Sequence, residues 1–243
     1  MKELSKPAET DKGLGQHLQA PMQRRSFFRY AGATAAAATL LLTTSCDDDD
    51  DGPMNPPMEG TVNLGSADVG ILNYAYALEQ LEAAFYTAVV AQSASALSTA
   101  EMDVMKDLMA HEVAHREFFK AALGNNAIPA LEVDFSSINF NDKNSVLSTA
   151  RTFENLGVAA YNGAGKLFTD TGVGLTYLLL AGKIVSVEAR HAAAIDDLIA
   201  GGNRFGEEFI DSNGLDRALM PEAVLKAAAP FIATKIDFSN LPK

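Results

Sequence analysis

The chain has 243 residues, of which 48% are hydrophobic, so it is long enough to form one domain with a substantial core. Its 31 acidic and 19 basic residues give a net charge of −12, which argues against nucleic acid as a partner. The single cysteine excludes an internal disulfide and any four-cysteine metal module within this sequence.

The first 46 residues predict an export signal. Residues 24–28 read Arg-Arg-Ser-Phe-Phe and resemble a twin-arginine signal, and residues 31–42 form an apolar run too short to be read as a membrane-spanning helix. Cys46 follows a stretch that resembles a lipoprotein processing site, which predicts lipidation of this residue. We therefore expect an exported protein of the cell envelope, held by a lipid anchor in a membrane and facing the periplasm or the cell surface.

Residues 47–65 predict a tether, because an acidic run at 47–51 is followed by several prolines and glycines. Beyond the tether we expect a helical domain over residues 66–200 and a C-terminal extension over residues 201–243. The extension contains a short predicted helix that starts at Pro221.

Four segments repeat apolar residues every three or four positions, which predicts four amphipathic helices. They cover residues 69–90, 105–122, 147–168 and 177–198. Ser98 and Glu101 have the spacing of a capping box before the second helix, and Gly124 and Gly201 stand where the second and fourth helices should end. The connection over residues 124–143 reaches about 66 Å when extended. It can therefore run the length of a bundle whose helices are about 37 Å long.

Each predicted helix carries a glutamate on its apolar stripe, and two of them carry a histidine three residues later. Side chains three residues apart share one face of a helix, so each Glu-x-x-His pair can hold a metal ion from one side. The first two glutamates are 33 residues apart and the last two are 34 apart, which indicates an internal repeat. The six candidate metal ligands are Glu79, Glu112, His115, Glu154, Glu188 and His191.

Four ionised carboxylates facing one core require positive charge, because burying an unpaired charge costs several kcal/mol. Two divalent ions would balance them and leave two neutral imidazoles as ligands. Glu82 could replace Glu79 or add a further ligand, but the repeat sets Glu82 opposite Gly157 and therefore favours Glu79. We expect Glu112, together with Glu154 or Glu79, to bridge the ions.

The order Glu, Glu-x-x-His, Glu, Glu-x-x-His resembles the ferritin-like superfamily, in particular its exported branch related to desiccation-associated proteins. The resemblance covers about residues 66–200 and implies an all-α, ferritin-like four-helix bundle with a long crossover between helices 2 and 3. It also implies two iron or manganese ions that act on a small oxidant, such as peroxide or dioxygen, or on ferrous iron. Tyr86 and Tyr161 each follow a glutamate by seven residues; they are either hydrogen-bond donors to ligand carboxylates or packed core aromatics.

Two other interpretations stay open at this stage. Residues 111–115 read His-Glu-Val-Ala-His, the signature of zinc metalloproteases, in which His111 and His115 would bind zinc; this leaves Glu188 and His191 unexplained. A non-catalytic envelope protein, in which any bound metals only stabilise the bundle during stress, would use the same six ligands. The sequence identifies neither the metal nor an electron donor.

Overall fold

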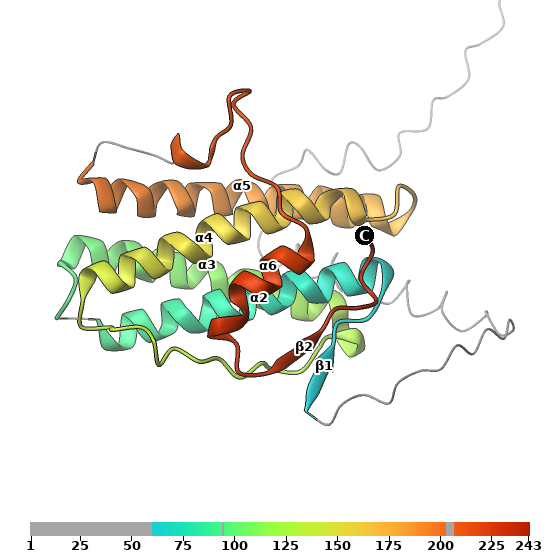
Figure 1. Ribbon diagram of the computed structural model, residues 1–243, viewed down its shortest axis with the longest axis horizontal. Coiled ribbons are helices and arrows are strands. Elements are labelled where there is room, and N and C mark those ends of the chain that lie inside the picture. The colour runs from blue at the N-terminus through green and yellow to red at the C-terminus, as the bar shows by residue number, and fades with distance from the viewer. Residues whose placement is uncertain (1–59, 94, 203–206) are drawn as a thin grey trace, which may run out of the picture. The chain divides into compact units, whose positions relative to one another are not determined.

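The computed structural model describes residues 60–93, 95–202 and 207–243. Its core consists of four long helices, α2 (Ala67–Gln92), α3 (Thr99–Leu123), α4 (Lys143–Ala164) and α5 (Val173–Ala200). α2 packs against α3, and α4 packs against α5, so two helical hairpins lie side by side (Figure 1). The predicted all-α four-helix bundle is confirmed. The export signal, Cys46 and residues 47–59 of the tether lie outside the described residues.

Shorter elements complete the described chain. The described residues also contain four turns of 3₁₀ helix: η2 (Gly124–Asn126), η3 (Gly165–Leu167), η4 (Glu207–Phe209) and η5 (Ala229–Phe231). The helix predicted to start at Pro221 is α6 (Pro221–Ala228). Two strands, β1 (Thr61–Asn63) and β2 (Lys235–Asp237), pair in parallel. This pair was not predicted, because three residues are too few to show the alternation of a strand.

Local sequence signals begin and end the helices as expected. The side chain of Ser98 accepts a hydrogen bond from the backbone N–H of Glu101, whose own carboxylate accepts one from the backbone N–H of Ser98 at 2.8 Å. This is the predicted capping box. Gly201 ends α5 with a φ of 71°, a left-handed conformation that glycine adopts without strain.

α2 is covered on nearly all sides, with 17 of its 26 residues buried. The long crossover of residues 127–142 and the C-terminal segment lie over the surface that α3, α4 and α5 leave open (Figure 1). Phe135 and Phe140 of the crossover contact Phe85 of α2, and Phe231 of η5 contacts Phe153 of α4. A helix that is apolar all round is expected to be buried in this way. No helix within the described residues is long and apolar enough to cross a membrane.

Two polar side chains of α2 attach the crossover to the bundle. The amide of Asn73, 3% exposed, donates to the carbonyl oxygens of Leu64 and Asn126 and accepts from the backbone N–H of Ile128. Two turns later, Gln80 accepts from the backbone N–H of Leu131 at 2.9 Å. The crossover therefore has its backbone groups satisfied where it passes over α2.

We expect the substitution Asn73→Ala to lower the free energy of unfolding by about 2 to 4 kcal/mol, because it leaves buried backbone groups without partners. Urea denaturation measures this loss. The control is Asn162→Ala, which removes one exposed hydrogen bond to the carbonyl of Arg217 and should cost at most about 1 kcal/mol. Equal losses in the two variants would contradict the role assigned to Asn73.

Candidate dinuclear metal site

The six predicted ligands converge within the bundle, and every long helix contributes at least one. They are Glu79 of α2, Glu112 and His115 of α3, Glu154 of α4, and Glu188 and His191 of α5. All four carboxylates are at most 1% exposed and His191 is 4% exposed. The side chain of His115 is slightly more open, at 12%.

The ligand atoms form two overlapping groups of four, and the atoms in each group lie within 4.8 Å of one another. One group consists of Glu79, Glu112, His115 and Glu188, and the other of Glu112, Glu154, Glu188 and His191. Each group offers three carboxylates and one imidazole, a donor set that suits iron, manganese or zinc. The arrangement is therefore compatible with two metal ions held side by side.

The carboxylates common to both groups are Glu112 and Glu188. The expectation that Glu112 would share a bridging role with Glu154 or Glu79 stays a prediction, although the residue that both groups have in common with Glu112 is Glu188. The internal repeat relates Glu112 to Glu188, so these two residues take equivalent positions in the two hairpins. Glu79 and Glu154 are also equivalent to each other, and each belongs to one group only.

Eight oxygen and nitrogen atoms of these six residues are buried without a hydrogen bond of acceptable geometry. The closest approaches are those of the histidine Nδ1 atoms to carboxylate oxygens: His115 lies 2.9 Å from Glu188 and His191 lies 2.8 Å from Glu112. Both histidines thus direct Nδ1 toward the centre of the site. Buried polar atoms left without partners are costly, and bound metal ions would satisfy them.

Two tyrosines donate hydrogen bonds to the two glutamates that belong to only one ligand group. Tyr86 donates a hydrogen bond to Oε1 of Glu154, and Tyr161 donates one to Oε1 of Glu79. Each tyrosine follows the glutamate of its own hairpin by seven residues and reaches the glutamate of the other hairpin. Hydrogen bonding of this kind orients a ligand carboxylate from outside the metal shell.

Burial and close contacts shift the pKa values of the site residues in opposite directions. Burial raises the pKa of Glu79 to about 7, although the neighbouring His115 lowers it, and burial raises the pKa of Glu188 well above its usual range. Burial also works against ionisation of Glu112, but the two adjacent histidines hold its pKa at about 2. Despite burial, the carboxylates around His191 raise its pKa to about 10. Without metal, protons and charged histidines therefore offset the buried carboxylates.

Glu82 is a fifth buried carboxylate and belongs to neither group. It occupies the space over Gly157 of α4, where a Cβ atom would lie 3.1 Å from Oε1 of Glu82 and 3.4 Å from Oε2 of Glu188. Burial raises the pKa of Glu82 well above its usual range. The structure thus places Glu79 in a candidate ligand group and sets Glu82 beside Glu188, in the room left because Gly157 has no side chain.

His111 lies beside His191 and outside both candidate ligand groups. It belongs to neither ligand group among the described residues, and its Nδ1 lies 2.9 Å from Nε2 of His191 instead. His111 is exposed, whereas Glu112 is buried and His115 is nearly so, and this arrangement gives the metalloprotease interpretation of residues 111–115 no support among the described residues. Sequence reasoning missed the contact with His191, which depends on how α3 and α5 pack.

Residues 67–201, which comprise α2 to α5, match the ferritin-like domain family over more than half of the chain. The chain belongs to the ferritin-like family. No curated protein matches it. Assignment of this ferritin-like protein to an exported, desiccation-related branch stays a prediction.

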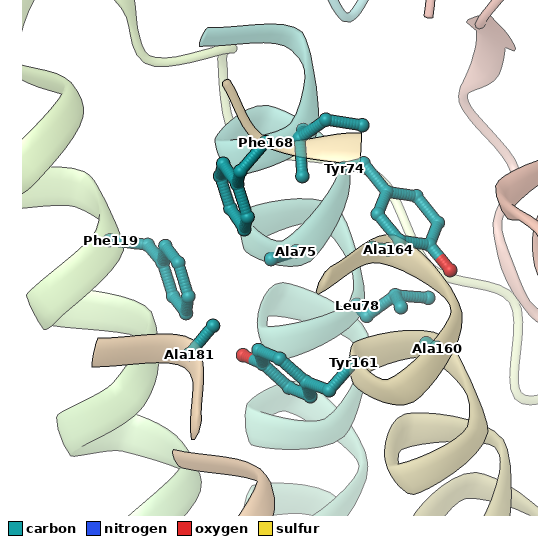
Figure 2. A pocket seen from close by; sticks show the side chains of 10 residues that line it. Tyr74, Ala75, Leu78, Phe119, Ala160, Tyr161, Ala164, Phe168 and Ala181 are labelled. Carbon is teal, nitrogen blue, oxygen red and sulfur yellow. The ribbon is translucent and has the colours of Figure 1, made fainter. Parts of the chain in front are cut away.

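An apolar pocket adjoins one end of the site of this ferritin-like protein. Phe119, Tyr161 and Phe168 surround it together with small residues of α2, α4 and α5 (Figure 2). Tyr161 is also the residue that binds Glu79, so the ring of one side chain lines the pocket while its hydroxyl reaches a candidate ligand. The cavity has a free volume of only about 10 Å³, which is room for about one water molecule.

The metal-free ferritin-like protein should lose stability as the pH rises from about 4.5 to 7. The folded-state pKa of Glu79 is about 7, above its unfolded value, so folding binds a proton in this window and the stabilisation is lost as that proton leaves. One such proton corresponds to a slope of about 1.4 kcal/mol per pH unit. Urea denaturation across this range measures the slope.

The variant Glu79→Gln should show a shallower slope because it cannot ionise at this position. Glu117→Gln, which changes an exposed glutamate of α3, should keep the slope of the unchanged protein. A Glu79→Gln variant with an unaltered slope would show that Glu79 does not titrate in this window.

Proposed function

We propose that this ferritin-like protein binds two iron or manganese ions with the six predicted ligands and passes electrons to hydrogen peroxide or dioxygen. The observation that carries the proposal is the pair of overlapping ligand groups, in which eight buried donor atoms have no other satisfactory partner. Two such ions supply two electrons when each changes its oxidation state by one.

The charges of the site support two ions. Two divalent ions carry four positive charges and offset Glu79, Glu112, Glu154 and Glu188, which lets both histidines bind as neutral imidazoles through Nδ1. Binding then releases the protons that the metal-free site holds. Affinity for metal should consequently increase with pH across the range in which Glu79 titrates.

The choice of substrate rests on the surroundings of the site. The burial of the carboxylates leaves little room for a large molecule, which favours a small oxidant. Glu82 supplies a carboxyl group next to Glu188 that belongs to neither ligand group. Because burial raises its pKa, this carboxyl group can stay protonated and can donate that proton when the oxidant is reduced.

Metal analysis by mass spectrometry tests the binding site. The purified chain, reconstituted with ferrous or manganous ions, should contain about two ions. The double variant Glu112→Ala, Glu188→Ala removes both shared carboxylates and should bind almost none. As a matched control, Glu117→Ala, Glu222→Ala removes two exposed glutamates and should retain both ions.

Peroxide consumption by the metal-loaded protein tests the activity. Loss of peroxide that requires the metals and disappears in the Glu112→Ala, Glu188→Ala variant supports the proposed oxidoreductase. Two bound ions that raise the melting temperature without turnover would instead establish the structural role. Failure of the unchanged chain to bind any metal would contradict the oxidoreductase and favour a non-catalytic structural protein.

We also propose that the chain is exported and lipid-anchored, on the basis of residues 24–28 and Cys46. The change Arg24→Lys, Arg25→Lys should leave the protein in the cytoplasm, whereas Cys46→Ala should allow export but release the protein from membranes. Cell fractionation and labelling with a radioactive fatty acid measure both outcomes. Membrane attachment that survives Cys46→Ala would contradict the lipid anchor.

A further inference from the structure

A pair of histidines in contact connects the surface of the bundle with the candidate metal site. His111 of α3 is exposed, and its Nδ1 lies 2.9 Å from Nε2 of the buried His191 of α5. The two ring planes are only 10° apart. An imidazole N–H and an imidazole lone pair both lie in the plane of their ring, so nearly parallel planes favour a hydrogen bond between these two nitrogens.

The chemistry of His191 decides the direction of this hydrogen bond. Nδ1 of His191 faces the carboxylates, at 2.8 Å from Glu112 and 3.4 Å from Glu154, so this is the nitrogen available to a metal ion. A neutral imidazole that binds metal through Nδ1 must carry its proton on Nε2. Nε2–H of His191 therefore donates, and Nδ1 of His111 accepts.

The other half of the site lacks such a partner. The repeat that relates Glu112 to Glu188 sets His111 opposite Val187, whose side chain cannot accept a hydrogen bond. Accordingly, Nε2 of His115 forms no hydrogen bond to any residue that the structure describes. Its Nδ1 instead lies near the carboxylates of Glu79, Glu112 and Glu188. The two metal positions thus differ in how their histidine is supported.

We propose that His111 is a positioning residue that holds His191 in the Nε2–H tautomer and so strengthens metal binding in the group formed by Glu112, Glu154, Glu188 and His191. The inference rests on the proposed metal function, but it adds a difference between the two ions. Partners of this kind, which hold the second ring nitrogen of a ligand histidine, are worth about 10- to 100-fold in metal affinity. The hydrogen bond to His111 should therefore make the ion beside His191 the more tightly bound of the two.

Two substitutions separate the hydrogen bond from simple packing. His111→Phe keeps an aromatic ring but removes the acceptor, whereas His111→Gln keeps an acceptor without the ring. Because His111 is exposed, neither change should disturb folding, which circular dichroism checks. Val187→Ala, at the position equivalent in the repeat, serves as the control and should leave both affinities within about threefold of the original.

The experiment is a titration of the full chain with Zn²⁺ against a chromophoric chelator, combined with nuclear magnetic resonance of ¹⁵N-labelled histidine rings. Zn²⁺ is diamagnetic, so the ring signals report which histidine binds each ion. In His111→Phe, binding at His191 should weaken by about 10- to 100-fold, while binding at His115 changes by less than about threefold. His111→Gln should restore most of the affinity. In the unchanged chain, a ¹⁵N–¹⁵N coupling across the hydrogen bond should connect His111 with His191.

The possible failures are distinguishable. If the unchanged chain binds two ions but His111→Phe and His111→Gln behave alike, or if the coupling is absent, the positioning role of His111 is overturned while the metal site stands. Equal weakening at His115 and His191 would also overturn it, because the effect would then be general. If the unchanged chain binds no Zn²⁺, iron or manganese, the proposed function fails and this inference fails with it.

Discussion

The burial of five carboxylates and two histidines in the core of one helical bundle is the constraint on which the rest of the structure depends. An apolar core tolerates such groups only when their charge is offset and their polar atoms have partners. The tyrosines satisfy the outer oxygens, and the histidines partly offset the charge. The inward atoms remain without satisfactory partners, which makes this core poorly suited to the metal-free state and well suited to bound cations.

The internal repeat gives the site its near symmetry. Glu112 and Glu188 occupy the shared positions, and each tyrosine reaches from its own hairpin to a glutamate of the other. This crossed arrangement means that neither hairpin completes the site alone. Correct packing of the two hairpins and formation of the site are therefore the same event.

The symmetry is broken at two positions, and each break has a chemical consequence. Glu82 faces Gly157, so one side of the site gains a carboxyl group that the other side lacks. The repeat pairs His111 with Val187, so among the described residues the outer nitrogen of His191 has an imidazole partner and that of His115 has none. Two ions bound in such a site would have unequal surroundings, and unequal surroundings allow one ion to bind or react before the other.

The cover over α2 links the fold to this chemistry. Asn73 and Gln80 attach the crossover to the same helix that carries Glu79, and aromatic contacts around Phe85 close that side of the bundle. Water is thereby kept from a part of the site, and a low local dielectric strengthens the interactions among the charged groups.

The sequence alone determined the four helices, their order and the six candidate ligands, because helical periodicity and the Glu-x-x-His spacing are local properties of the chain. It also favoured Glu79 over Glu82 through the position of Gly157. Only the tertiary structure decided that Glu188 is shared with Glu112, that the tyrosines cross between hairpins, and that His111 supports His191. These facts depend on the rotation and separation of packed helices, which are set by side chains far apart in the sequence, and so local patterns do not contain them.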